Sequence, residues 1–169
     1  MTLAETERLY REYSERYPDR EEMIDAVTDA ALDALCVPRK LLGFTYLFLA
    51  VRYLLSRPSY EHPGMLHEVY PYVAQQAGIG CVMAERAMRY AIAKAWKLAP
   101  PDVLTSYLGL RGADLGNPPT NVEFVYLVAE RVRLIVGDPE GEARFLEMLD
   151  ALDRRFADGL SRIDKARNR

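Results

Sequence analysis

The stretch "CVMAERAMRYAIAKAW" at residues 81–96 decides the fold, because it has the pattern of one helix with two unlike faces. One face collects the polar side chains of Glu85, Arg86 and Arg89. The opposite face carries apolar residues three and four positions apart, which is typical of a helix buried in a core. Its members are Ala84, Ala87, Met88, Ala91, Ile92 and Ala95. Solubility alone does not require two arginines and a glutamate side by side, so the polar face indicates a surface that contacts a partner.

The residues before this helix predict a helix-turn-helix. A helix is expected over 65–77, and "GIG" at 78–80 forms a turn before a second helix over 82–97. Ala74 lets the two helices approach, and Gly78 can take the left-handed backbone conformation that suits a tight turn. Any two crossed helices can show this spacing, so an ordinary helix pair remains the alternative at this point.

In a helix-turn-helix the second helix lies in the major groove of DNA, with its early residues at the base edges. Arg86 and Arg89 then offer the planar fork that matches guanine O6 and N7. Glu85 can accept a hydrogen bond from cytosine or orient a neighbouring arginine. Lys94 and Lys97 lie further along the helix, where we expect them to bind phosphates.

Helical patterns extend through the rest of the chain and predict an all-α protein, because no stretch alternates like a strand. Pro71 either opens the main part of its helix or kinks it. Thr120 and Glu123 have the spacing of a capping box at a helix start. Further helices are predicted over 2–16, 20–35, 39–56, 102–108 and 120–136, and a last one, with an apolar seam at 145–163, begins near residue 138.

Charge is distributed unevenly along the chain. Residues 1–35 carry a net charge of −6, residues 36–97 carry +5 and residues 98–169 carry −2, which gives −3 in total. Positive charge therefore gathers in the segment that contains the predicted helix-turn-helix, and such a concentration favours a polyanionic partner. Solvated lysines and arginines on ordinary helices are the alternative explanation.

Length, cysteine usage and hydropathy bound the class of protein. A chain of 169 residues, half of them hydrophobic, predicts one domain with short additions. Cys36 and Cys81 lie far apart without CxxC spacing, which favours a reducing cytoplasm over a disulfide framework. The most apolar run, at 41–51, is too short to span a membrane, so we expect no membrane partner. No metal-ligand or catalytic set stands out, and we expect neither a cofactor nor enzymatic activity.

Three strings of the sequence carry a family likeness: "VPRKLLGFTYLFLAV" at 37–51, "AERAMRYAIAKAW" at 84–96 and "NPPTNVEFVYLVAERVRL" at 117–134. In this order and with these gaps, they resemble the C-terminal effector domain of the master regulator of sporulation initiation in endospore-forming bacteria. The likeness covers roughly residues 25–136. It implies an all-α, six-helix DNA-binding domain, built around a helix-turn-helix, that binds a short G·C-containing promoter box and can bind as a tandem dimer.

The resemblance also implies site residues. Glu85, Arg86 and Arg89 match contact positions of the family, whereas Met83 stands where the family places an arginine. Cys36 stands where a glycine usually ends the first helix of the family domain. The family protein carries an N-terminal receiver domain that is controlled by phosphorylation. Because the residues before the likeness are too few to form that α/β domain, we do not expect its control to operate within this chain.

We therefore predict a stand-alone, sequence-specific DNA-binding transcriptional regulator. We expect an acidic N-terminal helical arm over 1–20, the effector domain over 21–136 and a C-terminal helix over 137–169. The apolar seam of the last helix either packs on the protein's own core or pairs with its twin in a homodimer. The alternative function is a protein-interaction module that keeps the fold and regulates a partner through its terminal helices.

Overall fold

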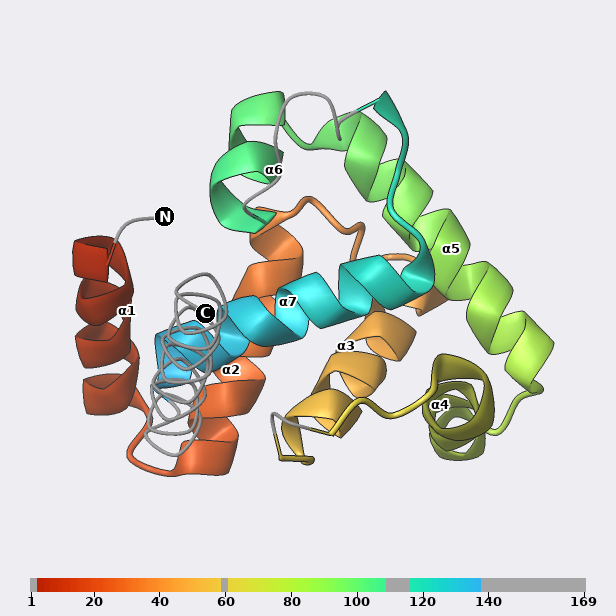
Figure 1. Cartoon of the computed structure of the whole chain (residues 1–169), viewed down its shortest axis with the longest axis horizontal. Helices are drawn as coiled ribbons and strands as arrows, with labels where there is room; N and C mark the ends of the chain where they lie inside the picture. Colours follow the sequence, from red (N-terminus) through yellow and green to blue (C-terminus); the bar gives the residue numbers. More distant parts are fainter. Residues whose placement is uncertain (1–2, 59–60, 109–115, 138–169) are drawn as a thin grey trace, which may run out of the picture. The chain divides into compact units, whose positions relative to one another are not determined.

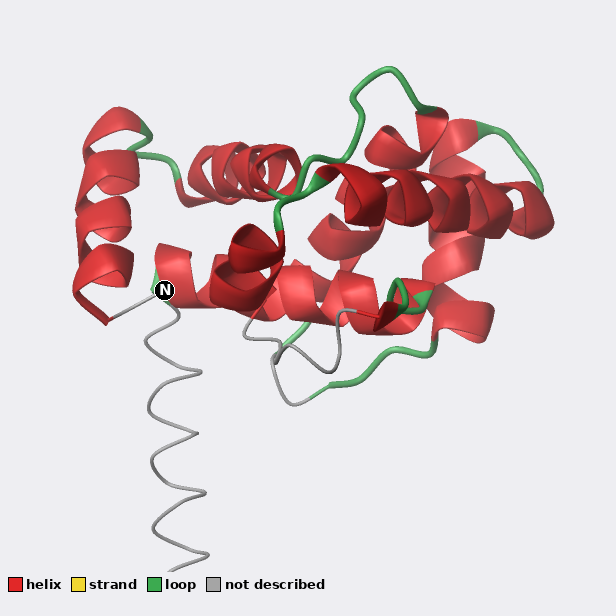
Figure 2. Ribbon diagram, turned by 90° about the horizontal axis from the view of Figure 1, so that it is seen from above, coloured by secondary structure: helices red, strands yellow, loops and turns green. Residues whose placement is uncertain are grey.

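The computed structural model describes residues 3–58, 61–108 and 116–137, and all regular structure in these ranges is helical, as the sequence predicts (Figures 1 and 2). The helices are α1 (Leu3–Arg16), α2 (Arg20–Ala34), α3 (Leu42–Leu55), α4 (Tyr70–Ala77), α5 (Cys81–Leu98), α6 (Pro101–Leu108) and α7 (Asn121–Val136). A π-helical turn, η1 (Met65–Val69), leads into α4. None of the described helices combines the length and the apolar character needed to cross a bilayer.

The chain divides into two units, residues 1–136 and residues 137–169, and the described helices belong to the first. Within the first unit, α1 packs against α2 and α7, and α2 to α7 match the six expected effector helices. The predicted division at residue 20 stays a prediction. The predicted last helix and its seam at 145–163 lie outside the described residues.

Helices α3 and α7 form the centre of the first unit. Helices α1 and α2 pack against α7, whereas α4 and α5 pack against α3. Figure 1 shows α1 at one end of this unit and the α4–α5 pair at the other, with α7 between them. Each of four helices contributes a fully buried side chain to the core between them, which includes Leu32, Leu47, Met88 and Phe124.

Helix α5 approaches α3 unusually closely, and small residues make this possible. A Cβ atom added to Gly43 of α3 would lie 2.2 Å from the carbonyl oxygen of Ala87 and 2.6 Å from the Cβ of Ala91. Real Cβ atoms do not come so near to such atoms, because close-packed interiors have no room for the overlap. The alanine face that the sequence predicts is therefore buried against a glycine on the neighbouring helix.

The helix ends follow the sequence signals. Asp19 caps α2 by accepting a hydrogen bond from the Glu22 N–H at 2.9 Å. The predicted capping box is confirmed, since the Thr120 N–H donates to Glu123 at 2.8 Å and the Glu123 N–H donates to the Thr120 hydroxyl at 3.3 Å. These contacts lower the pKa of Glu123, because the backbone N–H and then the hydroxyl of Thr120 stabilise its carboxylate.

Two local details concern α4 and α1. Pro71 opens the main part of its helix, which is the first of the two alternatives: it is the second residue of α4, just after η1, in which the N–H of Tyr70 bonds to the carbonyl of Met65. This wider turn lies next to a residue that has no N–H to donate. On α1, Leu9 and Tyr13 pack against the core, whereas Tyr10 is exposed.

The chain takes a left-handed conformation just after α2. Cys36 has a φ of 58°, a region that glycine adopts without steric cost. The resemblance predicts a glycine at this position, and the backbone explains why one would fit. Here the half-buried Cys36 side chain packs against the core instead.

Candidate nucleic-acid interface

A tight turn joins α4 to α5 and sets the angle between them. Gly78 ends α4 with a φ of 66°, and the N–H of Ile79 bonds to the carbonyl of Ala74 at 3.0 Å. Val73 is fully buried, and Ala77 and Ile79 pack against the core. The two helices are therefore joined by a short turn with a left-handed glycine, as the sequence predicts.

The buried face of α5 agrees with its sequence pattern. At most 1 % of the surface of each core member is exposed: Ala84, Met88, Ala91, Ile92 and Ala95. Ala87 is half-buried at the margin, against Gly43. Because these contacts hold α5 against α3 along most of its length, the orientation of its opposite face is fixed.

The polar face of α5 is open to solvent. Arg86, Arg89, Lys94 and Lys97 are exposed, and Glu85 is half-exposed. Arg89 donates a hydrogen bond to Glu85 at 2.9 Å across one helical turn. Arg86 makes no ion pair with any other described residue, so its guanidinium is free to bind a partner. The structure brings the predicted arginines and glutamate together near the start of the helix.

Three exposed side chains on this face were not among the polar residues that the pattern singled out. Tyr90 is 54 % exposed and lies one turn after Arg86, and the Lys94 ammonium group is 5.3 Å from the centre of its ring. Val82 and Met83, on the first turn of α5, are 59 % and 64 % exposed. Tyr90 and Val82 lie four residues from Arg86, and this spacing alone places them on the same helix face. The sequence indicated Met83 only through the family resemblance.

Other cations of the basic segment are held by α2. Arg39 pairs with Asp29 at 2.5 Å and with Asp33, and its guanidinium lies 4.9 Å from the centre of the Phe44 ring. Arg52 pairs with Glu21 at 2.6 Å and with Asp25 at 2.5 Å. The carboxylates of α2 therefore neutralise two arginines of the segment that carries +5, and much of its remaining free positive charge lies on α5.

Asn121, the first residue of α7, ties the two helices of the motif to the core. Its side-chain nitrogen donates to the Tyr70 hydroxyl of α4 and to the Glu85 carbonyl of α5, both at 3.0 Å. Burial raises the pKa of Tyr70, so its phenol stays neutral. Two of the strings that carry the family likeness are thus joined physically, since Asn121 belongs to one and Glu85 to the other.

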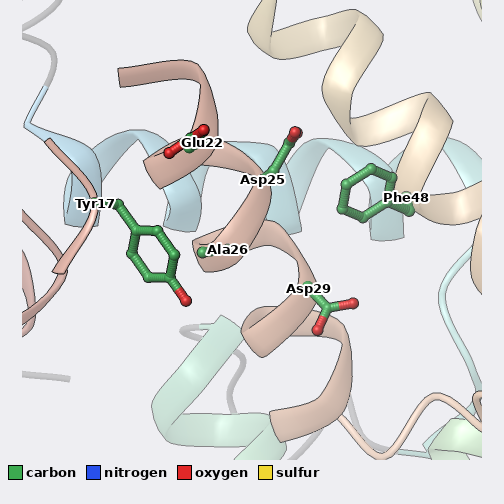
Figure 3. A pocket seen from close by; sticks show the side chains of 6 residues that line it. All are labelled: Tyr17, Glu22, Asp25, Ala26, Asp29 and Phe48. Atoms are coloured by element: carbon green, nitrogen blue, oxygen red, sulfur yellow. The ribbon is translucent and has the colours of Figure 1, made fainter. Parts of the chain in front are cut away.

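A groove of about 420 Å³ lies beside α2, away from this face, and its chemistry is different. Figure 3 shows the carboxylates of Asp25 and Asp29 between the rings of Tyr17 and Phe48, with Glu22 nearby. Carboxylates repel phosphates, so this groove does not belong to a nucleic-acid interface. Within the described ranges, no three acidic, histidine or cysteine side chains converge on a possible metal site, in this groove or elsewhere.

The fold and the open face of α5 define a class: a helical domain built around a helix-turn-helix, whose second helix presents basic side chains. A family model described as "Sporulation initiation factor Spo0A C terminal" matches residues 27–132, which is more than half of the chain. The chain therefore belongs to this family of helical DNA-binding domains. The match begins within α2 and ends within α7, so it includes the whole helix-turn-helix.

Proposed function

We propose that this protein is a sequence-specific DNA-binding transcriptional regulator that places α5 in the major groove of a G·C-containing promoter box. The observation that carries the proposal is the free guanidinium of Arg86, exposed near the start of the second helix of the motif. In this class of motif, the early residues of that helix reach the base edges. The proposal places the protein in the cytoplasm, with the chromosome.

Each polar residue of α5 has a role in this proposal. Arg86 donates two hydrogen bonds to a guanine. Glu85 either holds Arg89 in position, as its 2.9 Å contact with that residue suggests, or releases it and accepts from cytosine. The release of Arg89 by Glu85 costs little free energy, because an exposed ion pair across one helical turn contributes only about 0.3–0.5 kcal/mol. Lys94 and Lys97 bind phosphates further along the helix.

A binding selection on random duplex DNA with the intact chain tests the proposal. We expect it to enrich one box that contains a G·C pair. Replacement of this pair by another base pair should abolish the contribution of Arg86 to the binding free energy. On that box, Arg86→Ala loses about 1–3 kcal/mol of binding free energy and relaxes specificity at one base pair. Arg11→Ala removes the same charge from an exposed site on α1 and serves as the matched control. The control should bind like the parent. If Arg86→Ala binds like the parent as well, the assignment is wrong.

A salt titration tests the roles of the lysines. Neutralising phosphates releases counterions, so the logarithm of affinity falls linearly with the logarithm of salt concentration. Lys94→Ala should weaken all sequences about equally and reduce this slope by about one unit. The alternative function, a protein-interaction module, predicts weak DNA binding with no slope of this kind.

We also propose that residues 145–163 pair with the same residues of a second copy, because their apolar seam is narrow. Sedimentation of the intact chain at micromolar concentration tests this homodimer. Deletion of residues 138–169 should then reduce the mass by more than half and weaken binding to a tandem box. A monomeric intact chain that binds DNA like the deletion variant would contradict the proposal.

A further inference from the structure

The first turn of α5 exposes two neighbouring apolar side chains. Val82 is 59 % exposed and Met83 is 64 % exposed, whereas Ala84 and Met88 of the next turns are buried and Ala87 is half-buried. Neither residue belongs to the core cluster or packs against it. Their apolar character therefore has no role in holding the described part of the fold together, and both side chains are available to a partner.

Nothing in the described chain covers this turn. Gly80 precedes α5 at its N-cap position, and a Cβ atom added there, or to Gly78, would meet no atom within 4 Å. The start of the helix is therefore open on the side of the turn as well as on its exposed face. The first turn of α5 is therefore accessible to a binding partner.

The two side chains lie next to the residue that we assign to guanine. Met83 comes three residues before Arg86 and Val82 comes four before it, and both spacings place side chains on neighbouring positions of one helix face. One helical turn advances about 5.4 Å along the axis, which corresponds to one or two base pairs of DNA. An apolar contact therefore falls beside the guanine that Arg86 reads.

The major groove offers one apolar group, the 5-methyl of thymine, and apolar side chains contact it in other DNA-binding proteins. We propose that Met83, flanked by Val82, reads the methyl group of a thymine one or two base pairs from the guanine bound by Arg86. This inference rests on the proposed function and adds a specificity-determining residue to it. Cytosine and uracil lack the methyl group and lose this contact.

A protein partner is a poorer occupant of the same turn. An apolar protein surface that covered Met83 would also cover Arg86, which no carboxylate among the described residues neutralises. An unpaired charge is costly to bury. DNA accepts both groups at once, because the base edges beside a thymine methyl carry the acceptors that arginine binds.

Deoxyuridine substitution isolates the methyl group. In the box found by selection, each thymine is replaced singly by deoxyuridine, which removes one methyl and leaves base pairing unchanged. We expect the intact chain to lose affinity about fourfold at one position beside the Arg86-dependent guanine, as the transfer of one methyl group predicts. Met83→Ala should bind the thymine and deoxyuridine boxes equally, whereas Met83→Leu should keep the difference.

Leu98→Ala is the matched control, because Leu98 is 61 % exposed at the other end of α5 and should leave the methyl dependence intact. If no deoxyuridine substitution changes the affinity of the intact chain while Arg86→Ala still does, thymine reading is overturned and the proposed function stands. If the difference survives in Met83→Ala and disappears in Val82→Ala, the assignment to Met83 is wrong. A selection that yields no box overturns both.

Discussion

Helices α2 and α5 each carry one apolar face and one charged face, but they use their charges in opposite ways. The carboxylates of α2 bind Arg39 and Arg52, so the charged face of α2 is occupied by the protein's own arginines. The cations of α5 stay exposed, and the ion pair that the structure describes on this helix joins two of its own residues, Glu85 and Arg89. The carboxylates of α2 thus bind arginines of neighbouring segments, whereas the cations of α5 are available to a partner.

The buried faces differ in the same sense. Helix α2 is held by bulky side chains such as Met23, Ile24 and Leu32. Helix α5 buries mainly alanines and comes within contact of the backbone at Gly43. Small residues leave little freedom for a helix to shift, because its backbone itself is in contact. The exposed polar face of α5 therefore has an orientation that is fixed by the contact with α3.

The largest expected effect comes from disturbing that close approach. Gly43→Ala places a methyl group 2.2 Å from the Ala87 carbonyl, so α3 and α5 must separate. We expect a loss of about 3 kcal/mol in the free energy of unfolding, measured by urea denaturation, as is found for severe overpacking. Gly64→Ala is the control, because a Cβ atom there meets nothing within 4 Å. Equal stability of the two variants would contradict the close packing of α5.

The second effect concerns the link between α7 and the motif. Asn121→Ala removes the hydrogen bonds to Tyr70 and to the Glu85 carbonyl and leaves buried acceptors without this donor. A loss of about 2 kcal/mol in the free energy of unfolding is expected. Tyr70→Phe removes only one of the two bonds and should cost about half as much. A cost for Tyr70→Phe equal to that of Asn121→Ala would show that the bond to α5 contributes nothing.

The contrast between α2 and α5 was only partly predictable from the sequence. Helical periodicity, with glycine and proline between the helices, was enough to predict every described helix and both faces of α5, because these signals are local. The capping box at Thr120 and Glu123 is local as well, and the structure confirms it.

The remaining features depend on distances between segments. Asn121 and the Glu85 carbonyl are 36 residues apart in the sequence, and nothing in the pattern of either string indicates that they touch. The choice of Arg39 and Arg52 as partners for α2 depends likewise on where α3 lies in the fold. Counting charges predicted a basic segment but could not show which of its cations remain free, since pairing is decided by packing.

A third prediction compares an arginine that pairs with α2 and an arginine that is exposed on α5. Arg52→Gln removes a side chain that is 19 % exposed and leaves Glu21 and Asp25 without their shared cation, so it should cost about 1 kcal/mol of stability. Its DNA affinity should remain that of the parent chain when the folded fraction is equal. Arg86→Gln should do the reverse, with unchanged denaturation and weakened DNA binding. A variant that lowers both quantities equally would remove the distinction between α2 and α5.

The smallest effect compares the turns that follow α2 and α4. Both have a left-handed residue, Gly78 after α4 and Cys36 after α2, but only the first is a glycine. Cys36→Gly removes the steric cost of a φ of 58° and loses the contacts of a half-buried thiol, whereas Cys36→Ala loses those contacts and keeps most of the cost. The glycine variant should therefore be more stable than the alanine variant by about 0.5 kcal/mol, measured by urea denaturation of both. If the alanine variant is the more stable one, the backbone after α2 relaxes at no cost, and the two turns differ in more than their residue.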